Sequence, residues 1–276
     1  MRESGFSHPS RSKPFDRDEF GLTRFIVVEG RRLGGFGAPP GSVDRATTRF
    51  DFTFVALPPR TRSEAMTRYA VKEVFLTLQG EGARAGRAAV FCRFSGCNLW
   101  SGREPDRTGA LCRFCDTDFI GMDGPGGGRF KIAGDLAAAI ERAWTGGPVN
   151  RYVVFTGGEP LLQLDEALIE AVHARGFEVA VETNGTVEAP PGLDWICVSP
   201  KAGAPIVLDA GSELKLVYPQ EGLIPEHLSD LAFSHFFLQP MDGPELAKNT
   251  AAAIAYCLHH PRWRLSLQTH KLIGIA

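Results

Sequence analysis

The chain has 276 residues, of which 43% are hydrophobic and 22% are charged, and its formal net charge is -2 at pH 7. These proportions are typical of globular domains and exclude collagen-like, coiled-coil and wholly disordered chains. The near-neutral charge argues against a protein that coats nucleic acid. The sequence contains neither an apolar run of about eighteen residues nor a charged-then-apolar leader, so we expect a cytoplasmic protein without a transmembrane helix.

Residues 1–65 differ in composition from the remainder of the chain. They are rich in Arg, Ser, Pro, Gly and Asp, as are segments that bury no core. Two apolar patches interrupt them, Phe25 to Val28 and Phe50 to Leu57, and the second alternates like a lone strand. We interpret residues 1–65 as a poorly ordered extension, or as translated sequence upstream of a true start at Met66. Residues 66–276 form the predicted functional domain.

From Tyr69 onward, short apolar strands alternate with amphipathic helices. The expected strands are Ala70–Leu76, Ala88–Phe94, Tyr152–Phe155, Glu178–Val181, Trp195–Val198, Glu213–Val217, Phe236–Leu238 and Trp263–Leu267. The expected helices are Ile132–Trp144, Leu161–Ala174 and Pro244–His259. Such alternation predicts an α/β fold with a parallel sheet, and polar residues at the strand ends are typical of barrel-type sites. The βα units are too few for an eight-fold barrel, so we expect a partial, open βα barrel.

Three of the six cysteines, Cys97, Cys112 and Cys115, are spaced as Cys-x14-Cys-x2-Cys after a predicted strand. In a cytosolic protein such clustering favours metal chemistry over disulfides. Three thiolates from one loop can hold three irons of a [4Fe–4S] cluster and leave the fourth iron open. A structural zinc site requires a fourth protein ligand, which no histidine is spaced to supply. The spacing alone leaves a cluster, a zinc ion and three unrelated buried thiols as alternatives.

A second motif, Thr156-Gly157-Gly158-Glu159-Pro160, follows a buried strand and precedes a helix. Glycines at such a turn let the backbone approach a ligand closely, and Glu159 can accept a hydrogen bond from an ammonium group. A Gly-Gly-Glu tripeptide by itself is a weak signal. At a strand end that follows a three-cysteine loop, it favours the cluster over zinc.

With these two motifs the chain resembles the radical S-adenosylmethionine (SAM) superfamily. The usual spacing there is Cys-x3-Cys-x2-Cys, and the longer spacing of this chain resembles the variant in the 7-carboxy-7-deazaguanine synthase family. The inserted stretch, Asn98 to Leu111, is expected to form a small excursion. Further segments resemble that family in the same order, namely Phe75–Gly82, Phe91–Trp100, Cys115–Asp118, Glu182–Thr186, Ser199–Lys201 and Gln268–Lys271.

The resemblance implies a lyase that converts 6-carboxy-5,6,7,8-tetrahydropterin to 7-carboxy-7-deazaguanine and ammonia, a step of queuosine biosynthesis. It implies a [4Fe–4S] cluster, SAM and Mg²⁺ as cofactors. It also implies a homodimer and an electron donor such as flavodoxin. The alternatives are another radical SAM enzyme, such as a glycyl-radical activase, and a zinc-stabilised binding module.

The resemblance further implies roles for the residues at matching positions. Cys97, Cys112 and Cys115 would ligate the cluster, and Thr117 would ligate Mg²⁺. The residues expected at SAM are Phe114, Cys115, Asp116, Gly158, Glu159, Glu182, Ser199, Pro200, Lys201, Gln239, Pro240, Met241 and Asp242. The residues expected at the pterin are Leu78, Gln79, Gly80, Arg93, Thr156 and, through its carboxylate, Ala276.

Two smaller expectations concern residues outside these sets. Cys92, Cys197 and Cys257 are interpreted as small hydrophobes, with Cys257 on a helix. The apolar residues Leu272, Ile273 and Ile275 are expected to anchor the C-terminal tail.

Deletion of residues 1–65, so that translation starts at Met66, should leave a folded and active enzyme. The motif-bearing strands begin only after that point, and the deleted segment shows no periodic core pattern. Circular dichroism and turnover of the truncated chain, compared with the full chain, provide the measurement. Loss of folding or of substrate binding would show that the segment belongs to the core or to the site.

Overall fold

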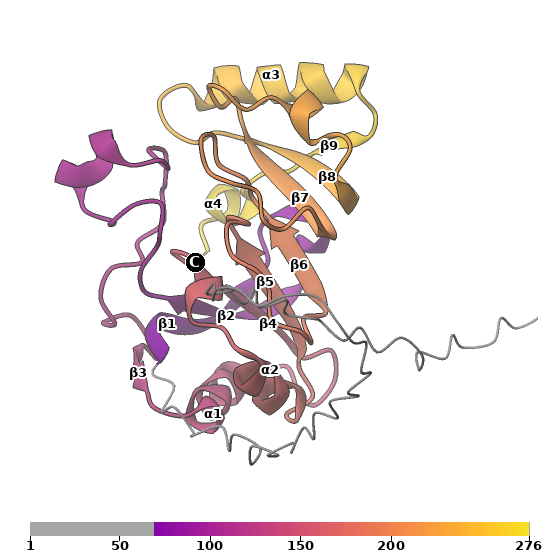
Figure 1. The fold of residues 1–276 in the computed structure, drawn as a ribbon. Coiled ribbons are helices and arrows are strands. Elements are labelled where there is room, and N and C mark those ends of the chain that lie inside the picture. The colour runs from indigo at the N-terminus through magenta and orange to yellow at the C-terminus, as the bar shows by residue number, and fades with distance from the viewer. Residues whose placement is uncertain (1–68, 276) are drawn as a thin grey trace, which may run out of the picture. The chain divides into compact units, whose positions relative to one another are not determined.

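The computed structural model describes residues 69–275 (Figure 1). Three expectations concern residues outside this range. They are the poorly ordered extension over residues 1–65 with its lone strand over 50–57, the start at Met66, and the role of Ala276. In the described part, no helix is long and apolar enough to cross a membrane.

A single nine-stranded sheet organises the described residues, in the order β3-β1-β2-β4-β5-β6-β7-β8-β9. The strands are β1 Tyr69–Leu78, β2 Ala88–Phe94, β3 Gly128–Phe130, β4 Tyr152–Gly157, β5 Glu178–Thr183, β6 Trp195–Val198, β7 Ala210–Tyr218, β8 Ala232–Pro240 and β9 Trp263–Leu265. Neighbours from β2 to β9 are parallel, and β1 pairs antiparallel with both β2 and β3. The sheet stays open, so the expected partial βα barrel is confirmed.

Four α-helices accompany the described strands, namely α1 Ala133–Ala143, α2 Glu166–His173, α3 Leu246–His259 and α4 Thr269–Ile273. Figure 1 shows α1 and α2 together on one side of the sheet and α3 beside β8 and β9. Buried residues of α1 and α2, such as Ile140 and Leu168, pack on Val153 and Phe155 of β4. Ala253 of α3 packs in a second core with β8 and β9.

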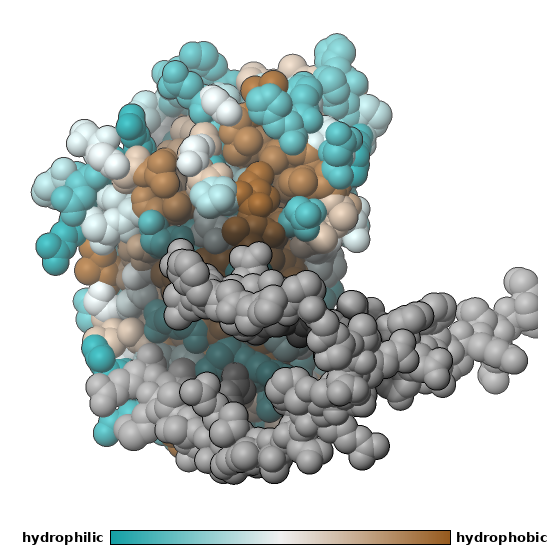
Figure 2. Space-filling model, viewed as in Figure 1, coloured by the Kyte–Doolittle hydropathy of each residue, from teal (hydrophilic) through white to brown (hydrophobic). Residues whose placement is uncertain are grey.

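The viewed face of the molecule carries apolar residues near β7, and hydrophilic residues surround them (Figure 2).

The predicted helix over Leu161–Ala174 is wrong as one element. A short 3₁₀ helix at Pro160–Leu162 precedes α2, which begins at Glu166. The Asp165 carboxylate accepts a hydrogen bond from the Leu168 amide at 3.0 Å, so Asp165 caps a new helix. The tyrosine hydroxyl of Tyr69 donates to the same carboxylate at 2.8 Å and ties this start to β1.

The expectation that apolar residues anchor the C-terminal tail is also wrong. Leu272 and Ile273 are 70% and 61% exposed, and Ile275 is 37% exposed. The tail forms α4 and is held by polar contacts, since the Thr269 amide and hydroxyl both donate to the Gly80 carbonyl at 3.0 and 2.8 Å. Cys92 and Cys197 are buried as expected, whereas Cys257 lies on α3 as expected but is only partly buried. The short strand β3 was not expected from the sequence.

Replacement of Ile140 by Ala should lower the free energy of unfolding by about 2–5 kcal/mol, because the fully buried side chain would leave a cavity between α1 and the sheet. Ile254→Ala on α3 is the matched control, since Ile254 is 41% exposed. That variant should stay within about 0.5 kcal/mol of the parent. Urea denaturation gives both values, and equal losses would show that α1 does not anchor the core.

Candidate active site

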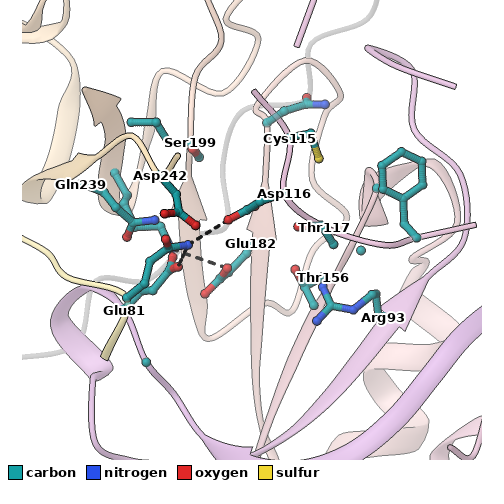
Figure 3. A pocket seen from close by; sticks show the side chains of 18 of the residues that line it. Glu81, Arg93, Cys115, Asp116, Thr117, Thr156, Glu182, Ser199, Gln239 and Asp242 are labelled. Atoms are coloured by element: carbon teal, nitrogen blue, oxygen red, sulfur yellow. Dashed lines mark hydrogen bonds and ion pairs between the residues drawn. The ribbon is translucent and has the colours of Figure 1, made fainter. Parts of the chain in front are cut away.

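A cavity of about 380 Å³ lies at the carboxyl ends of the parallel strands, within the range of small-molecule sites. Its walls come from the end of β1, the cysteine loop, the ends of β4 to β8 and the C-terminal helix α4. Figure 3 shows Glu81, Asp116, Glu182 and Asp242 facing one another at one end, while Arg93, Thr117 and Thr156 gather at the other. The cavity therefore has two chemically different ends.

Most of the site residues expected from the sequence line this cavity. They are Leu78, Gln79, Gly80, Arg93, Cys97, Cys112, Phe114, Cys115, Asp116, Thr117, Thr156, Gly158, Glu182, Ser199, Lys201, Gln239, Pro240, Met241 and Asp242. Glu159 and Pro200 are buried outside the lining. The structure thus brings together segments that are far apart in the sequence.

The glycines at the end of β4 pack against the chain that leads into the cysteine loop. A Cβ on Gly158 would lie 2.0 Å from the Gly96 carbonyl oxygen, and one on Gly157 would lie 2.2 Å from the Phe94 oxygen. Gly157 also has a φ of +131°, which side chains rarely adopt. The Glu159 amide donates to the Gly96 carbonyl at 2.9 Å. These two positions require glycine because the two backbones approach so closely, whether or not a ligand also contacts them.

The carboxylate of Glu159 joins the ends of β4 and β5. It is fully buried and accepts hydrogen bonds from the Leu161 amide at 2.9 Å, the Thr183 hydroxyl at 2.7 Å and the Asn184 amide at 2.8 Å. Burial raises the pKa of Glu159, and these three donors oppose that rise. The carboxylate therefore braces the strand ends beneath the cavity and presents Gly158 to it.

The three loop cysteines have the donor set that an iron–sulfur cluster needs. All three line the one cavity. A hydrogen bond from Cys112 lowers the pKa of the Cys115 thiol to about 6, and the Thr117 amide assists. Burial raises the pKa of Cys97, although the Leu99 amide donates to its sulfur at 3.4 Å. Backbone donors aimed at sulfur stabilise thiolate ligands, so the residues fit a cluster.

Among residues 69–275, no group of three or more His, Cys, Asp or Glu side chains is arranged to hold a single metal ion.

Arg93 lies at the end of the cavity opposite the acidic residues. Its Nε donates to Glu73 Oε1 at 2.8 Å, and it pairs in register with Thr156 on the parallel strand β4. Figure 3 shows Arg93 beside Thr117 and Thr156. An arginine in this position can present a fork of donors to an anionic group in the cavity.

Lys215 of β7 is a site residue that the sequence reasoning missed. Its side chain is only 4% exposed and forms ion pairs with Glu81 and, at 3.5 Å, with Glu182. Burial lowers the pKa of Lys215, but the surrounding acidic groups outweigh it and hold that pKa well above its ordinary value. The signal was present, because Glu213 and Lys215 place two charges on one face of an otherwise apolar strand.

The helix α4 closes the acidic end of the cavity. Lys271 Nζ lies 2.6 Å from the Asp116 carboxylate and 2.5 Å from that of Asp242. Gln268 donates to Asp116 at 3.2 Å and to Glu81 at 3.0 Å. The C-terminal segment therefore connects the cysteine loop with the loop after β8 and with the end of β1.

Comparison with known proteins gives the class and then the family. Residues 108–212 match the Radical SAM superfamily. With the three-cysteine loop and the glycine strand end at one cavity of an open α/β barrel, this match defines a radical SAM enzyme.

Over 207 residues the chain is 69% identical to the 7-carboxy-7-deazaguanine synthase of Bordetella pertussis and 68% identical to that of Caulobacter vibrioides, covering 75% of this chain and 99% of each relative. The crystal structure of QueE from Escherichia coli is similar with a TM-score of 0.54 and 27% identity, covering 72% of this chain and 93% of that chain. The chain belongs to the 7-carboxy-7-deazaguanine synthase family.

Replacement of Lys215 by Met should lower the free energy of unfolding by about 3–5 kcal/mol, because it leaves the Glu81 and Glu182 carboxylates buried without their cation. Adding Glu81→Gln to Lys215→Met should recover part of that loss. Lys248→Met is the control, since that lysine is 80% exposed and its pair with Glu245 contributes about 0–1 kcal/mol.

The stability that the Glu81–Lys215 ion pair contributes depends on pH. Burial raises the pKa of Glu81, but Lys215 lowers it further, so that it lies below its ordinary value of 4.5. The stabilisation is therefore complete above pH 4.5 and is lost as the pH falls through the folded-state pKa. Denaturation curves across this range should show a smaller loss in the Lys215→Met/Glu81→Gln variant than in the parent, because other paired carboxylates such as Asp116 titrate in both.

Proposed function

We propose that this chain is a radical SAM lyase that converts 6-carboxy-5,6,7,8-tetrahydropterin to 7-carboxy-7-deazaguanine with release of ammonia, in queuosine biosynthesis. The observation that carries the proposal is that one cavity combines three loop cysteines with Arg93, in a chain 69% identical to a synthase of that name. Coverage of 99% of that relative favours this function over an activase or a zinc-stabilised module.

The two ends of the cavity correspond to two bound molecules. The cluster and SAM supply, when bound, the radical that takes a hydrogen atom from the substrate. Cys97, Cys112 and Cys115 would hold three irons, and Gly158 and Lys201 would contact the SAM beside them. Ser199 accepts a hydrogen bond from Lys201 at 2.6 Å, which fixes the direction of that ammonium.

The substrate would occupy the end with Arg93. The guanidinium would bind the pterin carboxylate, and Thr156 would approach from the neighbouring strand. Gln79 is held by its side-chain hydrogen bond to Glu182 at 2.8 Å and by backbone hydrogen bonds to Arg87 and Gly86. The pyrimidinone edge would lie against this fixed strand end, from Leu78 to Gly80. The walls from the cysteine loop and α4 would shield the radical reaction from water and thiols.

Further components rest on the family resemblance. Thr117 would ligate Mg²⁺ together with the substrate carboxylate, because hydroxyl and carboxylate oxygens suit a hard cation. The terminal carboxylate of Ala276 would accept hydrogen bonds from the pterin. The enzyme would act as a homodimer in the cytoplasm, where thiols stay reduced, and would receive electrons from a donor such as flavodoxin.

Anaerobically reconstituted protein should be brown, with absorbance near roughly 400 nm and about four irons per chain, and should form the deazapurine from the carboxypterin. Cys97→Ala should abolish cluster binding and SAM cleavage, because two thiolates do not hold the cubane. Cys257→Ala is the matched control and should keep its iron, since Cys257 lies on α3. Colourless protein with one zinc would refute the enzyme assignment.

Arg93→Ala should weaken pterin binding roughly ten- to a hundred-fold, because loss of a charged hydrogen bond costs about 1.5–3 kcal/mol. Iron content should not change. The single variant also leaves Glu73 unpaired beside the substrate carboxylate, so the Arg93→Ala/Glu73→Gln double variant separates lost attraction from added repulsion. Calorimetric titration with the pterin gives the affinities, and unchanged affinity in both variants would make Arg93 structural.

A further inference from the structure

The stretch Asn98–Leu111, which separates the first two cysteines, has a defined fold. Residues Glu104–Gly109 form a 3₁₀ helix, and the Leu111 amide donates to the Leu99 carbonyl at 3.2 Å to close the base of the excursion. The proposed function uses the cysteines on either side and assigns nothing to this stretch. One of its side chains, Arg107, contacts the backbone around the second and third cysteines.

The side chain of Arg107 connects this 3₁₀ helix to the second and third cysteines. Nε and Nη2 donate to the Glu104 carboxylate at 2.8 and 2.6 Å. Nη1 donates to the carbonyls of Arg113 at 2.8 Å and of Cys115 at 3.1 Å. The guanidinium lies 4.0 Å from the centroid of the Trp100 ring. These contacts use both the planar face and the fork of donors, which a lysine lacks.

The two carbonyl contacts determine the direction of two peptide groups. In a trans peptide the C=O and the following N–H point to opposite sides. With the Arg113 and Cys115 carbonyls bound to Arg107, the amides of Phe114 and Asp116 are turned away from the guanidinium. The Asp116 amide donates to its own carboxylate.

Arg107 also places a permanent positive charge beside the ligands. Its Nη1 lies 3.1 Å from the carbonyl oxygen of Cys115. A fixed cation this close to the turn favours negative charge on the neighbouring sulfurs. Nearby charge and hydrogen bonds to the sulfurs are among the factors that set the potential of an iron–sulfur cluster.

We infer that Arg107 is a positioning residue for the cluster, which orients the Cys112–Cys115 turn from outside and favours its reduced, more negative state. The inference rests on the cluster ligation in the proposed function. It gives the fourteen-residue spacing a purpose, since the excursion delivers this guanidinium to the turn.

The test compares Arg107→Ala with the parent and with Arg103→Ala, all as full chains reconstituted anaerobically. Arg103 belongs to the same excursion, and its side chain donates no hydrogen bond to the cysteine turn among the described residues. Two quantities are measured, the rate of iron loss to a chelator and the midpoint potential from an electron paramagnetic resonance titration. Arg107→Ala should lose iron about tenfold or more faster and should have a more negative potential. Arg103→Ala should match the parent.

Arg107→Lys separates geometry from charge. It keeps the positive charge and lacks the fork, so its potential should stay near that of the parent while its iron is lost faster. If Arg107→Ala does not fold, this variant carries the test, and parental iron retention in it would overturn the inference. Equal behaviour of Arg103→Ala and Arg107→Ala would overturn it as well. A parent chain that binds no iron would instead refute the proposed function.

Discussion

The close packing of the β4 strand end on the chain that enters the cysteine loop positions the remainder of the site. The Gly158 position leaves no room for a Cβ, because the Gly96 carbonyl oxygen would lie 2.0 Å away. Cys97 follows Gly96 directly, so the first cysteine of the loop is positioned by a contact between two backbones. Glu159 fixes the same junction from below through its bonds to the end of β5. A glycine pair and one buried carboxylate therefore determine where the cysteine loop meets the cavity.

Two lysines hold the acidic end of the cavity, of which Lys215 is buried and Lys271 is 39% exposed. Lys215 joins Glu81 to Glu182, and Lys271 joins Asp116 to Asp242. Desolvated ion pairs are weak sources of stability, and hydrophobic residues of the same shape often serve stability better. Their value here is that each lysine contacts two segments from different parts of the chain, so the walls hold one geometry around a small molecule.

The sequence predicted every described strand except β3, the open barrel and most of the cavity lining, because periodic apolar runs and strand-end motifs are local signals. It missed features that depend on tertiary contacts. The antiparallel pairing of β1 follows from sheet assembly, and the break before α2 depends on the cap at Asp165. Lys215 lies within β7 and not at a strand end, and its ion pairs are formed with residues distant in the sequence. The prediction that Leu272 and Ile273 anchor the tail was wrong because hydrophobicity alone does not determine burial at a terminus.

Three residues from different parts of the chain hold the cysteine loop in place. Gly158 packs on the chain beside Cys97, Arg107 binds the outer carbonyls of the turn, and Lys271 binds Asp116 immediately after Cys115. Lys271 lies on the same short helix whose Thr269 binds the Gly80 carbonyl at the end of β1. The cysteine turn and the end of β1 are thus linked through a single helix turn. A shift of the cysteine turn would displace Asp116, then Lys271 and then Gly80, so the positions of these two walls of the cavity depend on the same contacts.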